Sequence, residues 1–312
     1  MELRIFVEPQ EGATYDQQLA MARAAEQHGF GAFFRSDHLL RIKPGDPGRG
    51  PTDSWVTLGA LARETSTIRL GTMVTSATFR LPGPLAVAVA QVDEMSDGRV
   101  EIGLGTGWYE AEHRAYGIPF PPFGERFDRL EEQLEIVTGM WKTQPGESYE
   151  FHGEHYDLDP GPALPKPRQQ PHPPVIVGGL GPRRTPALAA RFAAEFNVPF
   201  ADVETARACF ERVREACTAA GRDADELVCS HAVTVCCGED DAELERRARR
   251  IGRELEELRQ NGAAGTPAEV AARLEQYRAA GASRAYLQVI DIDDLEHVAL
   301  IAAEVMPRLG GV

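Results

Sequence analysis

Short apolar runs alternate with amphipathic segments along the whole chain. Eight of these runs are short and largely apolar rather than alternating, which is typical of parallel strands buried on both faces. They predict strands at residues 3–7, 32–34, 68–74, 98–105, 175–177, 195–197, 227–235 and 285–289. Between them, apolar residues recur at helical spacing. This spacing predicts helices over residues 15–28, 54–64, 84–95, 123–141, 185–193, 205–220, 241–259, 267–281 and 295–306.

The regular order of strands and helices predicts a (β/α)8 TIM barrel rather than an open doubly wound sheet. A chain of 312 residues fits such a barrel as a single domain, residues 1–312. Residues 143–174 interrupt the pattern, because they are rich in proline and contain a hairpin pattern between Tyr149 and Leu158. We expect this segment to be an insertion between the fourth helix and the fifth strand.

The chain is acidic, with a formal net charge of -15, and 43 % of its residues are hydrophobic. This charge argues against nucleic acid and against an anionic membrane as partners. No apolar run approaches the roughly 18 residues that cross a bilayer. Five cysteines without metal-binding spacing, together with the lack of a signal peptide, predict a cytoplasmic protein in a reducing compartment.

Active sites of α/β barrels lie at the carboxyl ends of the strands. The sequence places polar residues and glycines there: Glu8, Ser36, Asp37, His38, Thr75, Ser76, Thr106, Gly107, Glu110, Gly178, Gly179, Gly181, Asn197 and Gln288. An imidazole at His38 suits general acid–base chemistry, or it simply closes the barrel wall. Glu110 and Glu112 are candidate acids, and positions on a surface helix or loop explain them equally well. No His or Cys spacing predicts a metal site.

Two glycine clusters are candidates for contact with a flat or anionic ligand. Residues 103–107 read GxGxG rather than GxGxxG and follow several strand–helix units, which argues against a dinucleotide-binding Rossmann unit. The second cluster, residues 178–181, stands directly before Pro182, Arg183 and Arg184 at a predicted helix start. Free backbone N–H groups there, beside two guanidiniums, suit a phosphate. A tight turn with a solvated basic cap is the alternative.

Several motifs together resemble the bacterial luciferase-like superfamily, and more closely its branch that uses the deazaflavin coenzyme F420. They are the Ser-Asp-His of residues 36–38, GTMVT at 71–75, the stretch 98–108, the stretch 110–120, and Val-Gly-Gly at 177–179. The resemblance covers nearly the whole chain. It implies a TIM-barrel oxidoreductase that exchanges hydride with its substrate at the central ring of a flavin or deazaflavin.

The resemblance also implies roles for individual residues. His38 and Glu110 are the expected catalytic residues, with His38 facing the substrate. In the family a bulge on the third strand, often with a non-proline cis peptide, presses backbone against the ring. The residues expected to contact the coenzyme are Asp37, Met73 and Val74 (at that bulge), Thr106, Gly107, Trp108, Gly178, Gly179, Gly181 and Arg183. The glycines after the fifth strand, with Arg183, would hold its phosphate.

One position departs from the glucose-6-phosphate dehydrogenase branch of the family, where a catalytic Glu stands in place of Trp108. This departure argues against a sugar-phosphate substrate and favours a more apolar, aromatic pocket. Three functions therefore stay open: an F420-dependent oxidoreductase, an FMN-dependent monooxygenase using molecular oxygen, and a flavin-binding protein without turnover. We expect a small-molecule substrate and, because superfamily members are often dimers, a possible homodimer.

Overall fold

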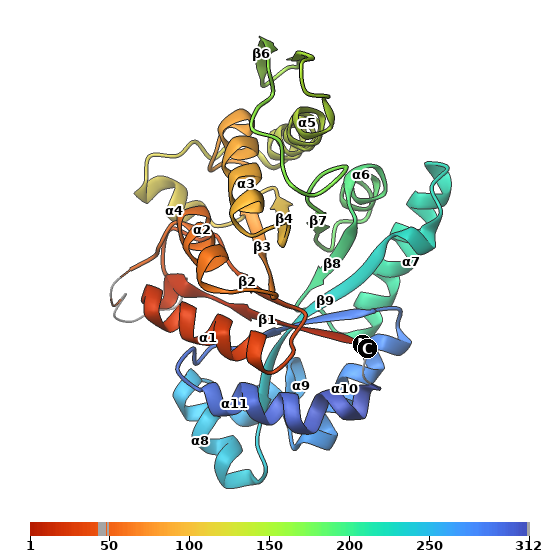
Figure 1. Ribbon diagram of the computed structural model, residues 1–312. Helices are drawn as coiled ribbons and strands as arrows, with labels where there is room; N and C mark the ends of the chain where they lie inside the picture. Colours follow the sequence, from red (N-terminus) through yellow and green to blue (C-terminus); the bar gives the residue numbers. More distant parts are fainter. Residues whose placement is uncertain (43–47, 49, 311–312) are drawn as a thin grey trace.

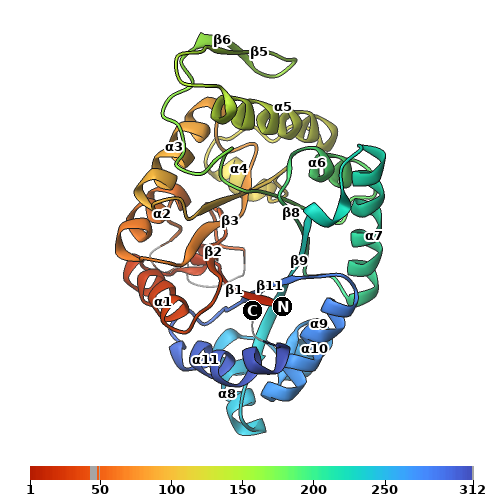
Figure 2. The same ribbon diagram turned by 45° about the vertical axis from the view of Figure 1, so that its right-hand side comes forward.

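Eight parallel strands close into a barrel, and helices cover its outside (Figures 1 and 2). The computed structural model describes residues 1–42, 48 and 50–310. Around the barrel the strands are β1 (Glu2–Val7), β2 (Ala32–Arg35), β3 (Arg69–Ser76), β4 (Val100–Gly105), β7 (Val175–Gly178), β8 (Glu195–Pro199), β9 (Val228–Cys237) and β11 (Arg284–Gln288). The ring closes because β9 pairs with both β8 and β11. The predicted TIM barrel is confirmed.

Most helices begin and end within two residues of their predicted bounds. They are α1 (Tyr15–Gln27), α2 (Ser54–Glu64), α3 (Pro82–Met95), α4 (Glu110–Ala115), α5 (Phe123–Lys142), α6 (Arg184–Phe192), α7 (Val203–Ala219), α8 (Asp241–Ile251), α9 (Leu255–Asn261), α10 (Pro267–Ala279) and α11 (Leu295–Leu300). Local caps explain this agreement. The Asp53 carboxylate accepts the Val56 N–H at the start of α2, and Thr14 with Gln17 forms a capping box at the start of α1.

Three predictions of helices need correction. The helix predicted at 241–259 is two helices, because Gly252 adopts the left-handed conformation (φ 68°) and ends α8. A short strand, β10 (Ala263–Gly265), then pairs with β9. Helix α3 begins at Pro82 rather than Pro84, since the earlier proline takes the first helical position. The last helix continues beyond α11 as single π and 3₁₀ turns to Leu309.

The proline-rich insertion forms a hairpin of β5 (Tyr149–His152) and β6 (Asp157–Gly161), drawn at the top of Figure 1. Its second strand lies slightly later than the predicted residues 155–158. The hairpin is attached to α5 through Glu132, whose carboxylate accepts the backbone N–H groups of Glu154 (2.8 Å) and Tyr156 (3.0 Å). It therefore projects from the helical layer and leaves the barrel itself uninterrupted.

The amino-terminal half of the barrel interior is filled by side chains. At the floor the Arg4 guanidinium donates to Glu101 (2.6 Å) and to the Tyr286 hydroxyl (2.9 Å). Above it, the rings of Phe34 and Tyr286 meet edge to face, with centroids 5.0 Å apart. Because this half is closed, open space in the barrel lies at the carboxyl ends of the strands. None of the helices in the described part of the chain combines the length and apolar character needed to cross a bilayer.

Candidate functional site

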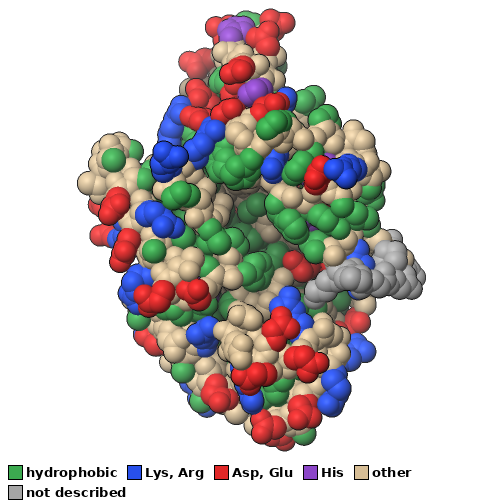
Figure 3. All heavy atoms as spheres, turned by 180° about the vertical axis from the view of Figure 1, so that it is seen from behind, with side chains coloured by type: hydrophobic (Ala, Val, Ile, Leu, Met, Phe, Trp, Pro, Cys, Tyr) green, Lys and Arg blue, Asp and Glu red, His purple; other side chains and the backbone are tan. Residues whose placement is uncertain are grey.

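A cavity of about 360 Å³ opens at the carboxyl ends of the barrel strands. Figure 3 shows this face from outside, hollowed at its centre, where hydrophobic side chains gather. Most of the predicted site residues line the cavity, namely Asp37, His38, Met73, Val74, Thr106, Gly107, Trp108, Gly178 and Gly179. Glu110, Gly181 and Arg183 do not reach it. Most residues that the resemblance suggested therefore lie at the mouth of the cavity, and their contacts distinguish the role of each.

The expected bulge is present on β3. The Met73–Val74 peptide is cis, and the pairing of β3 with β4 shifts between Thr72 and Thr75. The bulge pushes the Val74 side chain against β4. A Cβ on Gly103 would lie 2.6 Å from a Val74 methyl, and one on Gly105 would lie 2.8 Å from the other. These two glycines therefore make room for the Val74 side chain, and Gly105 also lines the cavity, where the sequence predicted contact with a flat ligand.

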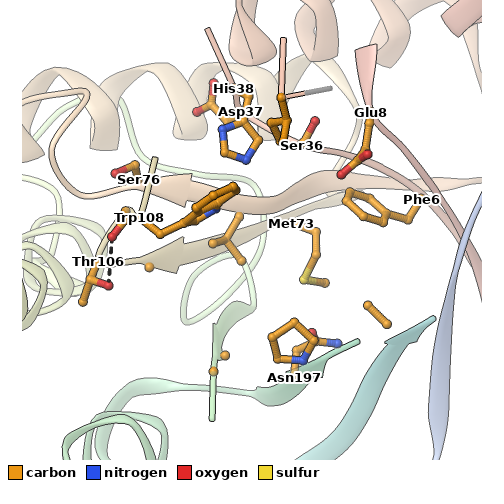
Figure 4. Close-up of a pocket in the computed structure, with 18 of the residues that line it drawn as sticks. Phe6, Glu8, Ser36, Asp37, His38, Met73, Ser76, Thr106, Trp108 and Asn197 are labelled. Carbon is orange, nitrogen blue, oxygen red and sulfur yellow. Dashed lines mark hydrogen bonds between the residues drawn. The ribbon is translucent and has the colours of Figure 1, made fainter. Parts of the chain in front are cut away.

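His38 and Glu112 form a hydrogen-bonded pair at the edge of the cavity. The imidazole Nδ1 lies 3.0 and 3.1 Å from the two carboxylate oxygens, and the Leu39 N–H donates to the same carboxylate at 2.9 Å. Glu112 is almost wholly buried, whereas the His38 side chain is 18 % exposed. Because a carboxylate accepts, Nδ1 is the donor in this pair. Nε2 has no hydrogen-bond partner among the described residues, and the ring faces the cavity (Figure 4).

The structure does not support the prediction that Glu110 is catalytic. Its carboxylate lies on the outer face of α4, 2.5 Å from the Arg114 guanidinium, and both side chains are largely exposed. Residues two apart on a helix point in nearly opposite directions. Glu112, the other acid that the sequence suggested, therefore points inward to His38 because Glu110 points outward.

Asp37 lies in the cavity wall, but its carboxylate is already engaged. It accepts from the Thr75 hydroxyl (2.9 Å) and from Arg80 (2.5 Å), and Arg80 also binds Asp53 (2.6 Å). Burial alone would lower the pKa of Arg80, but the charges of Asp37 and Asp53 raise it above its usual value. Asp37 thus holds the loop after β3 in place. A ligand would meet it only at the edge of this ion pair.

The predicted phosphate-binding residues at the end of β7 and after it divide into two pairs of different placement. Gly178 and Gly179 line the cavity, and a Cβ on Gly178 would lie 2.7 Å from the Asn197 carbonyl oxygen. The Gly179 N–H donates to that same carbonyl at 3.0 Å, so it is not available to a phosphate. Gly181 and Arg183 stand at the start of α6, whose first turn has no capping side chain. An anion would therefore bind beside the cavity, at that helix start.

Aromatic side chains form the outer rim of the cavity. Trp108 is 62 % exposed, stacks on Tyr109 with centroids 5.2 Å apart, and meets His38 edge on at 5.6 Å. Phe200 is 48 % exposed and adopts a positive φ of 48°, which is rare for a bulky residue. Phe200 was not predicted, since no local pattern marks the loop after β8. Among the described lining residues the charged groups are carboxylates, with no lysine or arginine.

A family model described as luciferase-like monooxygenase matches residues 1–261. The chain belongs to the luciferase-like monooxygenase family. An uncharacterized protein of Mycobacterium tuberculosis is 36 % identical over 65 % of this chain and 74 % of its own length. An F420-dependent glucose-6-phosphate dehydrogenase of Nakamurella multipartita is 35 % identical over 66 % of this chain and 59 % of its own. An FMNH(2)-dependent dimethylsulfone monooxygenase of Pseudomonas putida is 32 % identical over 45 % and 39 %.

Solved structures agree on the fold. An F420-dependent secondary alcohol dehydrogenase superposes with a TM-score of 0.85, at 19 % identity, over 99 % of this chain and 98 % of that one. The relatives use either F420 or FMN, as their names say. This protein is therefore a luciferase-like oxidoreductase, and its coenzyme and substrate have to be argued from its own cavity.

Proposed function

We propose that the protein transfers hydride between an F420-type deazaflavin and a small, uncharged organic substrate. One observation carries the proposal: His38 is held at Nδ1 by buried Glu112, and its Nε2 opens into the same cavity as the Met73–Val74 bulge. A general acid–base group is thereby fixed beside the place where a flat ring would lie. The F420-dependent relatives support the choice of coenzyme.

The described residues fit such a coenzyme. Gly107 and Gly178 present backbone to the cavity, where a Cβ would collide with Ser76 or with the Asn197 carbonyl. The uncapped start of α6 and Arg183 would hold an anionic tail. When bound, the coenzyme would supply or accept the hydride. FMN shares the flat ring and the phosphate, so the same residues would also hold FMN.

His38 would handle the proton that accompanies hydride transfer. In the oxidative direction, Nε2 takes the proton from the substrate's O–H or N–H group as hydride leaves its carbon, and in reverse Nε2 returns it. Glu112 keeps the proton of the other nitrogen on Nδ1 and stabilises the imidazolium that forms. The aromatic rim that includes Trp108 and Phe200 would cover the outer side of a bound substrate.

The lining favours an apolar, planar substrate without negative charge. Phe6, Phe79, Trp108 and Phe200 supply aromatic surface, whereas the described charged groups at the wall are acidic. The described lining offers a phosphorylated sugar no lysine or arginine with which to pair its phosphate. A ring stacked on Trp108 would gain both apolar contact and dispersion.

Titration with oxidised and reduced F420, and in parallel with FMN and FMNH₂, tests the proposal. Tight binding of F420, with substrate-dependent change of its absorbance and no oxygen uptake, is the expected result. Binding of FMNH₂ with oxygen consumption would instead support a monooxygenase, the function of the dimethylsulfone-oxidising relative. If neither coenzyme binds at tens of micromolar, the proposal fails.

A further inference from the structure

A second histidine, His113, is connected to the cavity through two hydroxyl groups. Its Nε2 lies 2.6 Å from the Thr78 hydroxyl, which lies 2.6 Å from the hydroxyl of Ser76. Ser76 lines the cavity beside Gly107, directly after the β3 bulge. The other imidazole nitrogen, Nδ1, lies 2.8 Å from the Tyr109 carbonyl oxygen. The chain Tyr109–His113–Thr78–Ser76 thus runs from buried backbone to the cavity wall.

The direction of every hydrogen bond in this chain follows from its buried end. A carbonyl oxygen only accepts, so His113 must donate through Nδ1. In a neutral imidazole Nε2 then accepts, and Thr78 must give its single proton to Nε2. Thr78 can accept only from Ser76, whose proton is therefore also used. The Ser76 hydroxyl oxygen also accepts the Thr78 backbone N–H at 3.4 Å, which leaves one further lone pair to accept a hydrogen bond at the cavity wall.

The surroundings of His113 fix this arrangement. Its side chain is fully buried between the rings of Phe79 (centroids 5.1 Å apart) and Phe120 (4.6 Å). The neighbouring carboxylates on α4 are engaged elsewhere, since Glu110 binds Arg114 and Glu112 binds His38. No described carboxylate therefore competes for either imidazole nitrogen, and the ring cannot turn without breaking the bond to the Tyr109 carbonyl.

We propose that His113 acts as a positioning residue that fixes Ser76 as a hydrogen-bond acceptor for the coenzyme. Ser76 would then select an N–H or O–H donor on the bound molecule, and it would disfavour a carbonyl oxygen at that place. The identity of the ligand rests on the proposed function, whereas the hydrogen bonds from His113 to Ser76 are present in the protein without coenzyme. The two parts can be tested separately.

The first test needs no ligand and alters no residue that lines the cavity. In nitrogen-labelled, coenzyme-free protein, long-range proton–nitrogen NMR reads the tautomer of each of the eight histidines. The His113 signals are assigned by their loss in His113→Asn. We expect the neutral Nδ1–H tautomer, with the Nε2 resonance shifted in Thr78→Val and unshifted in Thr138→Val. An Nε2–H tautomer, a doubly protonated ring, or no shift in Thr78→Val would contradict the proposed directions of these hydrogen bonds.

Thr138→Val is the matched control, because that buried hydroxyl donates to the Leu134 carbonyl on α5 rather than to a side chain at the cavity.

The second test measures coenzyme affinity with F420 and FMN as probes. Ser76→Ala should raise the dissociation constant about threefold to tenfold, the worth of one neutral hydrogen bond. Unchanged affinity in Ser76→Ala would overturn the role of Ser76 even if the tautomer is as expected. If neither probe binds the unaltered protein, the proposed function fails, and the NMR result still decides whether the chain exists.

Discussion

Two buried carboxylates, Glu101 at the floor of the barrel and Glu112 at its mouth, have different partners. At the floor, Arg4 lies between Glu101 and Glu195, and Arg69 and Arg284 complete the pairing of those carboxylates. At the mouth, the buried carboxylate of Glu112 faces an imidazole instead, and the far nitrogen of that ring opens into a cavity.

The difference shows which buried charges serve stability and which serve chemistry. Burial alone would lower the pKa of Arg4, but Tyr286, Glu101 and Glu195 raise it above its usual range. Burial alone would raise the pKa of Glu101, and Arg4 and Arg69 outweigh it and hold that pKa low. In this network each buried charge faces a charge of opposite sign, and none of these groups lines the cavity. At the mouth, His38 keeps one nitrogen for a ligand.

The largest effect is expected at the floor. Glu101→Gln leaves Arg4 and Arg69 facing a neutral amide in a buried site, which should lower the free energy of unfolding by about 3–5 kcal/mol in urea titrations. Because the folded pKa of Glu101 is depressed, its contribution is complete above its ordinary pKa and is lost as pH falls through the folded value.

Glu131→Gln provides the control for the floor. Glu131 pairs with Arg184 and Arg191 on the exposed side of α5, so its loss should change the free energy of unfolding by less than about 1 kcal/mol. Equal losses in the two variants would contradict the distinction between a buried network and a surface pair.

At the mouth the effect should fall on turnover instead. His38→Asn should lower the rate of hydride transfer by about a hundredfold or more, with little change in the urea midpoint, because it removes the proposed acid–base group. Stopped-flow absorbance of the coenzyme measures this rate. Full activity in His38→Asn would contradict the proposed acid–base role of His38.

Glu112→Gln and Glu110→Gln sharpen the same contrast within one helix. The first removes the charge that stabilises imidazolium and should slow transfer about tenfold or more, whereas the second breaks only an exposed pair with Arg114 and should leave the rate within about twofold. A reversed order would restore the original prediction for Glu110.

His231 tests a third kind of burial, a titratable side chain that faces no carboxylate. Neither of its nitrogens has a hydrogen bond in the described structure, and the ring stacks on Tyr277 at 3.8 Å. Burial lowers the pKa of His231 to about 3. The unfolded chain therefore binds a proton as pH falls below about 6.5, the folded protein does not, and stability declines over that window.

His231→Phe should remove this part of the acid sensitivity. Between neutral pH and about pH 5, the variant should lose about 2 kcal/mol less unfolding free energy than the unaltered protein. Urea titrations at the two pH values measure the difference. His297, whose pKa burial lowers to about 4, remains in the variant, so some acid sensitivity should persist. An unchanged pH dependence would contradict the assignment.

The barrel could be predicted from sequence because its signals are local. Short, largely apolar runs, a capping Asp53 and a proline at a helix start each act within a few residues. The break at Gly252 was missed because the charged pattern of residues 241–259 continues across it, and only the left-handed backbone shows the end of the helix.

The site was less predictable because its contacts join distant residues. Glu112 and His38 are 74 positions apart, and only the orientation of α4 decides that Glu112, not Glu110, turns inward. Phe200 follows a strand with no recognisable motif. The resemblance predicted the Met73–Val74 bulge. It did not predict that a side chain at Gly103 or Gly105 would collide with Val74.

The smallest expected effect concerns the aromatic rim. Calorimetric titration with nitrobenzyl alcohol and nitrobenzyl phosphate compares two probes with one ring and different charge. The alcohol should bind more tightly by about tenfold, because the described lining has no lysine or arginine to pair with the phosphate. Trp108→Leu should weaken binding of the alcohol about threefold to tenfold, since it removes the exposed ring face but keeps apolar volume.

Two further measurements decide whether Trp108 itself is the contact. Trp55 and Trp141 are only 4 % and 3 % exposed, so quenching of tryptophan fluorescence by the nitroaromatic alcohol should come mainly from Trp108 and nearly vanish in Trp108→Leu. Tyr116→Leu, which alters an exposed aromatic residue outside the cavity, should leave both affinity and quenching unchanged. Tighter binding of nitrobenzyl phosphate than of the alcohol would contradict the proposal that the substrate is uncharged. It would indicate that the mouth of the barrel offsets negative charge, as Arg4 does at the floor.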